Sequence, residues 1–172
     1  MTAYVALLRA VNVGGTGKLP MSELKDIAGE LGFENASTYI ASGNLIFSSA
    51  KGEAEVRDML EERLAAHMGK RVPVMIRTAE EMAAVAQGNP FKDAPGKRVL
   101  ATFLAEPPPT DALAAVRRQD GERLALGKRE IYVDYCGTLL GRSKLRIPAA
   151  QKGTARNMNT VAKLAAMAAE LE

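Results

Sequence analysis

The amino-acid sequence predicts an α+β fold in which antiparallel sheets carry helices on one face. Three observations support this prediction. Short apolar runs bounded by glycine, proline or asparagine alternate with segments whose apolar residues recur at helical spacing. Some neighbouring strands are separated by only a few turn-forming residues, which indicates antiparallel pairing. The order of elements in residues 1–78 is nearly repeated in residues 79–172.

The first strand is predicted over residues 3–11 (AYVALLRAV), a short apolar run that ends at a cluster of glycines. A helix of about three turns follows, because apolar residues from Leu24 to Leu31 recur at i, i+3, i+4 and i+7. Pro20 suits the first turn of this helix, where a missing N–H costs nothing, and Gly32 suits its C-terminal cap. These residues predict a strand that leads into an amphipathic helix.

A hairpin is predicted next, in the segment ASTYIASGNLIFSSA. Residues 38–40 and 45–47 are strand formers. Gly43 and Asn44 lie between them, and this pair is typical of a two-residue turn with positive φ. The segment therefore predicts two antiparallel strands.

A second helix and a fourth strand complete the first half of the chain. Val56, Leu60 and Leu64 are in register at i+4 within a helix predicted over residues 53–68. The segment RVPVMIRT, residues 71–78, predicts a strand whose early proline favours a sheet edge. The resulting β-α-β-β-α-β order is that of a ferredoxin-like module, and we assign it to residues 1–78.

The second half, residues 79–172, resembles a degenerate copy of this βαββαβ module. Thr78 to Glu81 fits a capping box at the start of a helix. Residues 142–156 predict no single conformation, because Pro148 interrupts any helix begun just before it. No final strand is expected. The predicted elements are a helix to about residue 86, a strand over 98–105, a short helix over 111–118, a hairpin around Gly127-Lys128 and a helix from about Asn157.

The composition is that of an ordinary soluble globular protein, with 47% hydrophobic and 25% charged residues in a chain of 172. No apolar stretch approaches the roughly 18 residues that a membrane span needs. The N-terminal segment lacks the features of a secretory signal. The single cysteine, Cys136, cannot form an internal disulfide. We therefore expect a cytoplasmic protein that has no membrane as a partner.

Positive charge is concentrated towards the end of the chain. Residues 1–87 carry 9 Lys/Arg and 11 Asp/Glu, whereas residues 88–172 carry 14 and 9. No acidic residue occurs between Asp134 and Glu170, and this gap contains six basic residues. An unbalanced basic stretch attracts anions. Two interpretations stay open, a solvated basic surface and a site for an anion or a nucleic acid. The basic residues are Arg142, Lys144, Arg146, Lys152, Arg156 and Lys163.

The glycine-rich segment LLRAVNVGGTGKLP invites comparison with phosphate-binding loops. A P-loop, G-x-x-x-x-G-K-[ST], would need glycine in place of Asn12 and a hydroxyl in place of Leu19, so this motif is excluded. A dinucleotide fingerprint, G-x-G-x-x-G, fails because Pro20 stands at its third glycine. Two interpretations remain: a tight turn between strand and helix, or an anion site in which Arg9 and Lys18 add charge to a helix N-terminus.

Few residues suit catalysis. His67 is the only histidine, and its place at the end of a predicted helix favours an interaction with the helix dipole over a role as base. Cys136 has no histidine near it in the sequence, which favours a buried structural thiol over a nucleophile. One histidine and one cysteine predict no zinc site, and no motif indicates another metal or a cofactor. No segment matches an RNA-recognition signature.

Polar residues also gather at the start of the last predicted helix. Asn157, Asn159 and Thr160 are all residues that can cap a helix, and Arg156 precedes them. Capping requires only one of them. The surplus leaves two interpretations open, a well-capped terminal helix or a site for an anion at its N-terminus.

Four motifs, in this order, resemble the bacterial family known as domain of unknown function 1697: LLRAVNVGGTGKLPMSEL, TYIASGNLIF, the NPF at 89–91 and TARNMNTVAKL. The family's usual pattern is similar to LLRGINVGG-x-x-x-[LV]PM, TYIQSGNVVF, NPF and T-x-RNWNTV-x-KL. The chain departs from this pattern at Ala10-Val11, at Ala41 and at Met158, where the family's tryptophan could have stacked on a ligand. The resemblance implies a small cytoplasmic α+β protein with a ferredoxin-like arrangement, and it implies no reaction.

The resemblance also indicates which polar residues to consider as a site. They fall at strand ends, turns and helix starts, where function is carried more often than in the apolar core. We expect them to converge on one polar site that accepts anions, at the junction of the two halves. The candidate ligand-binding residues are Arg9, Asn12, Gly14, Gly15 and Lys18 from the first motif, Ser42, Gly43 and Asn44 from the second, and Arg156, Asn157, Asn159 and Thr160 from the last.

Three functions are compatible with these observations. The first is a binding module for an anionic ligand, either a nucleotide or a nucleic acid, and it ranks highest because of the basic segment and the two helix N-termini. The second is an enzyme that acts on a small anionic substrate through Arg, Asn and Ser groups without a metal. The third is a structural or protein-interaction module. The sequence names no catalytic residue and leaves the oligomeric state open.

Overall fold

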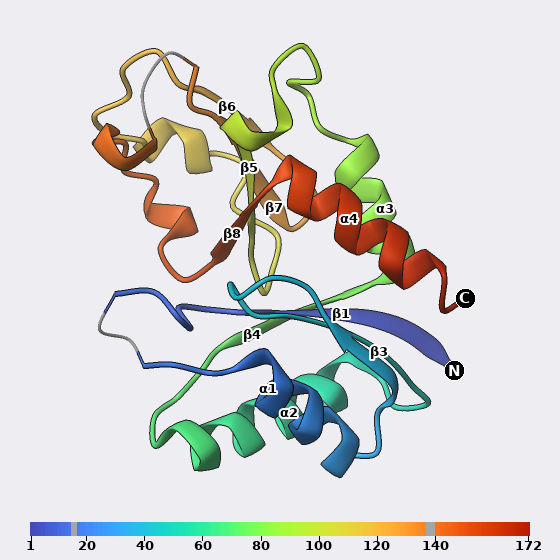
Figure 1. Cartoon of the computed structure of the whole chain (residues 1–172). Helices are drawn as coiled ribbons and strands as arrows, with labels where there is room; N and C mark the ends of the chain where they lie inside the picture. The colour runs from blue at the N-terminus through green and yellow to red at the C-terminus, as the bar shows by residue number, and fades with distance from the viewer. Residues whose placement is uncertain (15–16, 137–139) are drawn as a thin grey trace. The chain divides into compact units, whose positions relative to one another are not determined.

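The computed structural model describes residues 1–14, 17–136 and 140–172. These residues form an α+β protein with two four-stranded antiparallel sheets and four α-helices, which confirms the predicted class (Figure 1). The chain divides into two compact units. Met1–Ala83 and Lys163–Glu172 make up unit 1, and Ala84–Ala162 make up unit 2.

Unit 1 begins with the predicted order of strand, helix, strand, strand, helix and strand. β1 pairs with both β3 and β4, and β2 lies beside β3, so the sheet order is β2-β3-β1-β4. Tyr4 stands opposite Phe47 on one side and Thr78 on the other. The loop that follows β1 therefore begins inside the sheet, between the strands β3 and β4. The elements are β1 (Thr2–Leu8), α1 (Met21–Glu30), β2 (Glu34–Thr38), β3 (Asn44–Ser49), α2 (Glu53–Met68) and β4 (Val74–Thr78).

The core of unit 1 lies between its sheet and the helices α1 and α2, which cover one face together (Figure 1). The predicted stripe of α2 is confirmed, since Val56, Leu60 and Leu64 are fully buried. Phe33 stacks on Phe47 with ring centroids 4.3 Å apart. Each fully buried side chain of this size contributes roughly 1.5–3 kcal/mol, so this layer holds the sheet that carries the β1–α1 loop.

The connection between β2 and β3 differs from the predicted two-residue turn. The strands do pair antiparallel, but residues 39–43 join them. Ile40 and Gly43 have positive φ values of 51° and 90°. Asn44 belongs to β3, where it is fully buried, and its amide donates two hydrogen bonds of 2.9 Å back into the loop. The Gly-Asn pair favours positive φ, but here the asparagine closes a wider loop instead of forming the turn.

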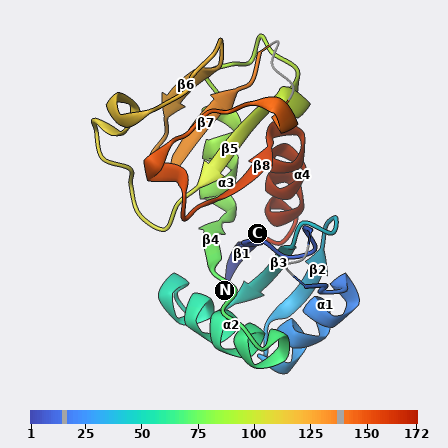
Figure 2. The ribbon, with the colours of Figure 1, turned by 90° about the vertical axis from the view of Figure 1, so that its left-hand side faces the viewer.

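The sheet of unit 2 has the order β6-β7-β5-β8 (Figure 2). As in unit 1, the first strand of the unit lies between its third and fourth strands, and the second strand is at the edge beside the third. β5 pairs antiparallel with both β7 and β8, and β6 pairs with β7. The predicted hairpin around Gly127-Lys128 is confirmed. The helices α3 and α4 each begin in one unit and end in the other. The elements are α3 (Ala79–Gln87), β5 (Val99–Phe103), β6 (Arg123–Leu126), β7 (Glu130–Asp134), β8 (Thr154–Asn157) and α4 (Met158–Ala169).

The strand β8 corrects the prediction that the second half lacks a final strand. It spans the end of the segment 142–156, for which no conformation was predicted, and Asn157, which was predicted to start the last helix, and it pairs with β5, where Ala101 stands opposite Arg156. Thr154 and Arg156 are buried and Ala155 is exposed. This short strand buries polar side chains, so apolar periodicity could not reveal it.

The prediction of a short α-helix over residues 111–118 is also wrong. Only a single 3-10 turn, Ala112–Ala115, forms there, and the backbone is extended at Val116. A segment this short cannot sustain an α-helix without strong packing, because nucleating the first turn is unfavourable. In the described part of the chain, no helix is both long and apolar enough to cross a membrane.

Candidate functional site

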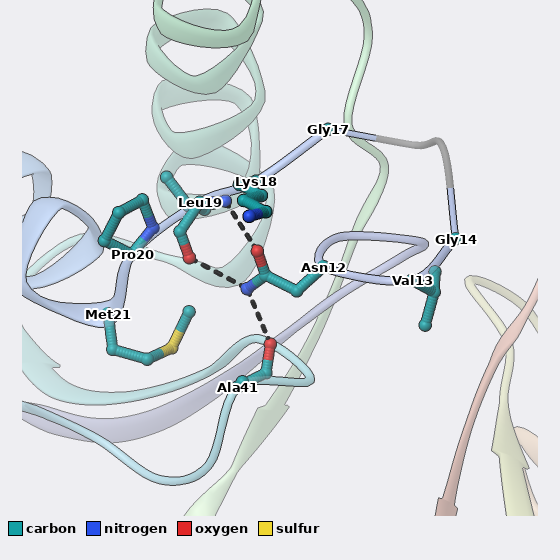
Figure 3. Close-up of a pocket in the computed structure, with 9 residues that line it drawn as sticks. All are labelled: Asn12, Val13, Gly14, Gly17, Lys18, Leu19, Pro20, Met21 and Ala41. Atoms are coloured by element: carbon teal, nitrogen blue, oxygen red, sulfur yellow. Dashed lines mark hydrogen bonds between the residues drawn. The ribbon is translucent and has the colours of Figure 1, made fainter.

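The loop between β1 and α1 is held in shape by the side chain of Asn12. Its Nδ2 donates to the carbonyl oxygens of Leu19 and Ala41, both at 2.8 Å, and its Oδ1 accepts from the backbone N–H of Leu19 at 2.6 Å (Figure 3). The N–H of Asn12 donates to the carbonyl of Gly17. Its φ of 57° is one that asparagine tolerates better than most residues. One side chain thus closes the loop and ties it to the turn before β3.

The turn before β3 packs closely against the end of β1. The backbone N–H of Leu8 donates to the carbonyl of Gly43 at 2.9 Å. A Cβ atom at Gly43 would lie 2.7 Å from Val11 Cγ2 and 3.0 Å from Leu8 Cβ. Glycine is therefore needed at this position for space as well as for its positive φ. The first and second motifs of the sequence meet here within unit 1.

A pocket of about 770 Å³ lies beside this loop (Figure 3). Its volume is within the range of small-molecule sites. The lining is mostly apolar, and Lys18 is the one ionisable side chain among the described residues that form it. A ligand with an apolar body and one anionic group would match this lining. The lining residues are Asn12, Val13, Gly14, Gly17, Lys18, Leu19, Pro20, Met21 and Ala41.

The electrostatics of the pocket favour an anion. Pro20 stands at the N-cap of α1, and no side chain caps this helix, whose N-terminus carries partial positive charge. A Cβ atom at Gly17 would lie 3.7 Å from the ammonium nitrogen of Lys70, so a second cation is close to the loop. Glu23 in the first turn opposes them, but its carboxylate contacts His67 Nε2 at 2.9 Å. Two lysine side chains and the N-terminus of α1 therefore place positive charge beside the loop.

The candidate residues of the first two motifs have different positions relative to the pocket. Asn12, Gly14 and Lys18 line it. Arg9 is half-buried and does not line it, and its backbone N–H donates to the carbonyl of Pro73. Gly15 lies outside the described residues. Ser42 and Gly43 belong to the adjoining turn that supports the pocket wall at Ala41, and Asn44 is the first residue of β3.

The candidate residues of the last motif lie in unit 2 and have internal partners. Asn157 Oδ1 accepts from the backbone N–H of Thr160 at 2.9 Å, which is an N-cap bond. Asn159 packs against Gly96, where a Cβ atom would come within 2.9 Å of Asn159 Cγ. The first two motifs belong to unit 1 and the last to unit 2, and convergence of all three on one site stays a prediction.

Arg156 is a strand residue and not a helix-terminal one. Its side chain points into a buried environment of β8, with only 6% of its surface exposed. Nη1 donates to Thr154 Oγ1 at 2.7 Å and to the carbonyl of Ala155 at 2.9 Å. Desolvation lowers the pKa of Arg156 to about 10. The guanidinium therefore stays charged at neutral pH and serves an internal network.

Residues 1–132 match the family described as "Protein of unknown function (DUF1697)". The chain belongs to the DUF1697 family. The matched segment includes the pocket, the NPF motif and unit 2 up to β7, whereas the last motif lies beyond it. A comparison with curated proteins found no match.

Among solved structures, this DUF1697 chain is similar to the conserved bacterial protein SP0830 from Streptococcus pneumoniae. The two sequences are 28% identical, the superposition covers 97% of this chain and 98% of the other, and the TM-score is 0.78. The similarity therefore extends over both sheets.

The NPF motif of this DUF1697 chain leads to an ionic network in unit 2 that the sequence analysis missed. Asp134, at the end of β7, is fully buried and accepts hydrogen bonds from Arg98 at 2.9 Å and from Arg123 at 2.6 Å. Arg123 also pairs with Asp93 at 3.0 Å and lies 4.7 Å above the ring of Phe91. Charged residues at strand ends were a usable signal, since Arg123 and Asp134 stand opposite each other in the β6–β7 register.

The protonation state of Asp134 follows from these contacts. Burial alone would raise the pKa of this carboxyl, but hydrogen bonds from the backbone of Cys136, from Arg123 and from Arg98 lower it to about 2. The network links the starts of β5 and β6 to the end of β7. Its two arginine side chains are partly exposed to solvent, whereas Asp134 is buried. No group of three or more His, Cys, Asp or Glu residues in the described part of the chain could hold a metal ion.

Proposed function

We propose that this DUF1697 protein binds a small ligand that joins an anionic group to an apolar body, such as a nucleotide, in the pocket beside the β1–α1 loop. The observation that carries this proposal is the pocket of about 770 Å³, whose mostly apolar lining includes Lys18 and the start of α1. Concave apolar pockets with a few convergent polar groups are the usual form of small-molecule sites.

Each part of the lining has a role in this proposal. The N-terminus of α1, Lys18 and the nearby Lys70 attract the anionic group. Leu19, Pro20 and Met21 offer apolar surface to the remainder of the ligand. The three side-chain hydrogen bonds of Asn12 keep the wall in place before the ligand arrives, which lowers the entropy lost on binding.

The same lining favours binding over catalysis. General acid–base chemistry needs a titratable group within hydrogen-bond reach of the reacting atom. Lys18 is the one ionisable residue among those described in the lining, and no carboxylate, histidine or thiol joins it there. A binding module is therefore the function that the geometry supports best, and we expect it to act in the cytoplasm.

We also infer that both units are variants of a ferredoxin-like module. Unit 1 has the element order of that module, and both sheets share one strand order. In unit 2 a 3-10 turn, Ala112–Ala115, replaces the helix between the first two strands. We propose that the first module comprises residues 1–78 and the second comprises residues 79–172.

Thermal unfolding with AMP, GMP, CMP, UMP and inorganic phosphate tests the proposed ligand class. A ligand present at about 100 times its Kd should raise Tm by about 5–10 °C in a chain of this length. At least one nucleotide should do so, and inorganic phosphate should do much less because it lacks an apolar body.

Three variants locate the binding site. Ala41→Trp fills the pocket and should abolish the shift, and Lys18→Gln should weaken binding about tenfold by removing one charge–charge interaction. Lys25→Gln is the matched control, since Lys25 is exposed on α1 and does not line the pocket. If no nucleotide shifts Tm, or if the control weakens binding as much as Lys18→Gln, the proposal is wrong.

A further inference from the structure

A row of basic side chains lies on unit 2 and includes none of the residues that line the pocket. We call it the basic ridge and define it as Arg117, Arg142, Lys144 and Arg146. All four residues are exposed. Arg117 and Arg146 are joined by two backbone hydrogen bonds of 2.9 Å, so the two chain segments run antiparallel at this point.

The backbone around Lys144 presents its charges on one side. Lys144 and Arg146 are exposed, whereas Leu145 and Ile147 are half-buried and pack against the core of unit 2. This alternation is that of an extended chain, in which every second residue points the same way. The Cα atoms of Lys144 and Arg146 are therefore about 6.6 Å apart.

Arg117 extends the row sideways. Residues that stand directly opposite each other in an antiparallel pair project from the same face, so Arg117 and Arg146 present their guanidinium groups together. Like charges in such a position are destabilising. Two like charges that stand opposite each other with no carboxylate between them are unfavourable for folding, and such unfavourable arrangements are typical of functional surfaces.

The charge of the ridge is not neutralised within unit 2. No acidic residue occurs between Asp134 and Glu170, and no ion pair joins a ridge residue to a described carboxylate. Glu122 lies beneath the ridge, but it is 3% exposed and its carboxylate accepts from Ser143 Oγ and from the backbone N–H of Asp120, both at 2.5 Å. In the described part of unit 2, the four cations of the ridge are therefore not paired with carboxylates.

We infer that the basic ridge binds single-stranded nucleic acid through its phosphate backbone, independently of base sequence. Exposed cations spread over two neighbouring chain segments suit a polyanion with repeated charges, whereas a small anion needs donors that converge on one point. An anionic membrane fits less well, because surface binding also uses apolar side chains for insertion. The large apolar residues exposed in the described chain, Met1, Val13 and Ile40, all lie in unit 1.

Fluorescence anisotropy with a labelled 20-nucleotide oligo(dT), an RNA of the same length and a DNA duplex tests this inference over a series of salt concentrations. If four phosphates are neutralised, log Kobs against log salt should have a slope of about −3 for the single strands. The triple variant Arg142→Gln/Lys144→Gln/Arg146→Gln should reduce this slope to about −1 and weaken binding at least tenfold.

The matched control carries Lys25→Gln, Arg71→Gln and Lys92→Gln, which removes the same charge from exposed positions outside the ridge. It should bind as the wild type does. Circular dichroism should show that both triple variants remain folded. Equal loss in the control, no binding at low salt, or binding only to vesicles of anionic lipid would each overturn the inference. The ridge and the pocket share no residue, so either proposal can fail alone.

Discussion

At Gly43 the loop before β3 packs closely against the end of β1. Two separate demands meet there, a φ of 90° and an approach that leaves no room for a Cβ atom. Gly32 has nearly the same φ, 81°, but faces open space. A comparison of substitutions at Gly43 and Gly32 therefore separates two contributions to the free energy of unfolding, that of the backbone conformation and that of close packing.

Gly43→Ala should destabilise the protein more than Gly32→Ala does. Positive φ costs an alanine about 1–2 kcal/mol at either position, and the contacts with Val11 and Leu8 should add about 1–3 kcal/mol at Gly43 alone. The midpoints of urea unfolding measure the difference. Equal destabilisation by the two variants would mean that the turn moves away from β1 at no cost.

At the scale of elements, Asp134 links the start of β5, the start of β6 and the end of β7. Its partners Arg98 and Arg123 approach from two different chain segments. The pKa of about 2 lies below the ordinary value of 3.8, so the folded state favours the charged carboxylate. The stabilisation is complete above about pH 5 and is lost progressively as the pH falls through 3.8 towards 2.

Asp134→Asn should remove this pH dependence. The lowered pKa corresponds to about 2 kcal/mol at neutral pH, because one pKa unit equals about 1.4 kcal/mol. The variant should be less stable than the wild type by about this amount at pH 7 and should approach it near pH 2. Thermal unfolding between pH 2 and 7 measures both curves. Curves that stay parallel would show that the carboxylate contributes no linked stability.

Elements with strong periodicity could be predicted from the sequence, whereas those held by polar contacts could not. The helix α2 could be predicted from Val56, Leu60 and Leu64, because a helix that buries one face carries apolar residues at intervals of three or four. The strand β8 buries Thr154 and Arg156, and it forms by pairing with β5, which lies far earlier in the chain. The pocket follows the same rule, since Asn12 and Lys18 could be singled out but the contact of Asn12 with Ala41 spans 29 residues.

At the scale of the whole molecule, α4 connects the two compact units. Its first residues belong to unit 2, and Lys163–Glu172 belongs to unit 1. Val161 and Leu164 are both fully buried and stand on either side of this boundary. Substitutions at these two positions should therefore weaken different units.

Leu164→Ala should accelerate amide hydrogen exchange in β1 and β3, and Val161→Ala should accelerate it in β5 and β8. The loss of a buried leucine side chain costs about 2–5 kcal/mol, which changes exchange by opening within one cooperative unit at least tenfold. Mass spectrometry of peptic peptides locates the change. The same increase over all eight strands in both variants would show that the chain unfolds as a single unit.

The division of α4 also determines when each unit can be completed on the ribosome. Residues 84–162 emerge before residues 163–172, although unit 1 contains the start of the chain. Unit 1 is therefore made of two separate segments, and all four strands of its sheet are translated before the segment 163–172 that joins it. A chaperone that protects the nascent chain would therefore encounter the sheet of unit 1 before the last segment of that unit is made, whereas unit 2 is one continuous segment.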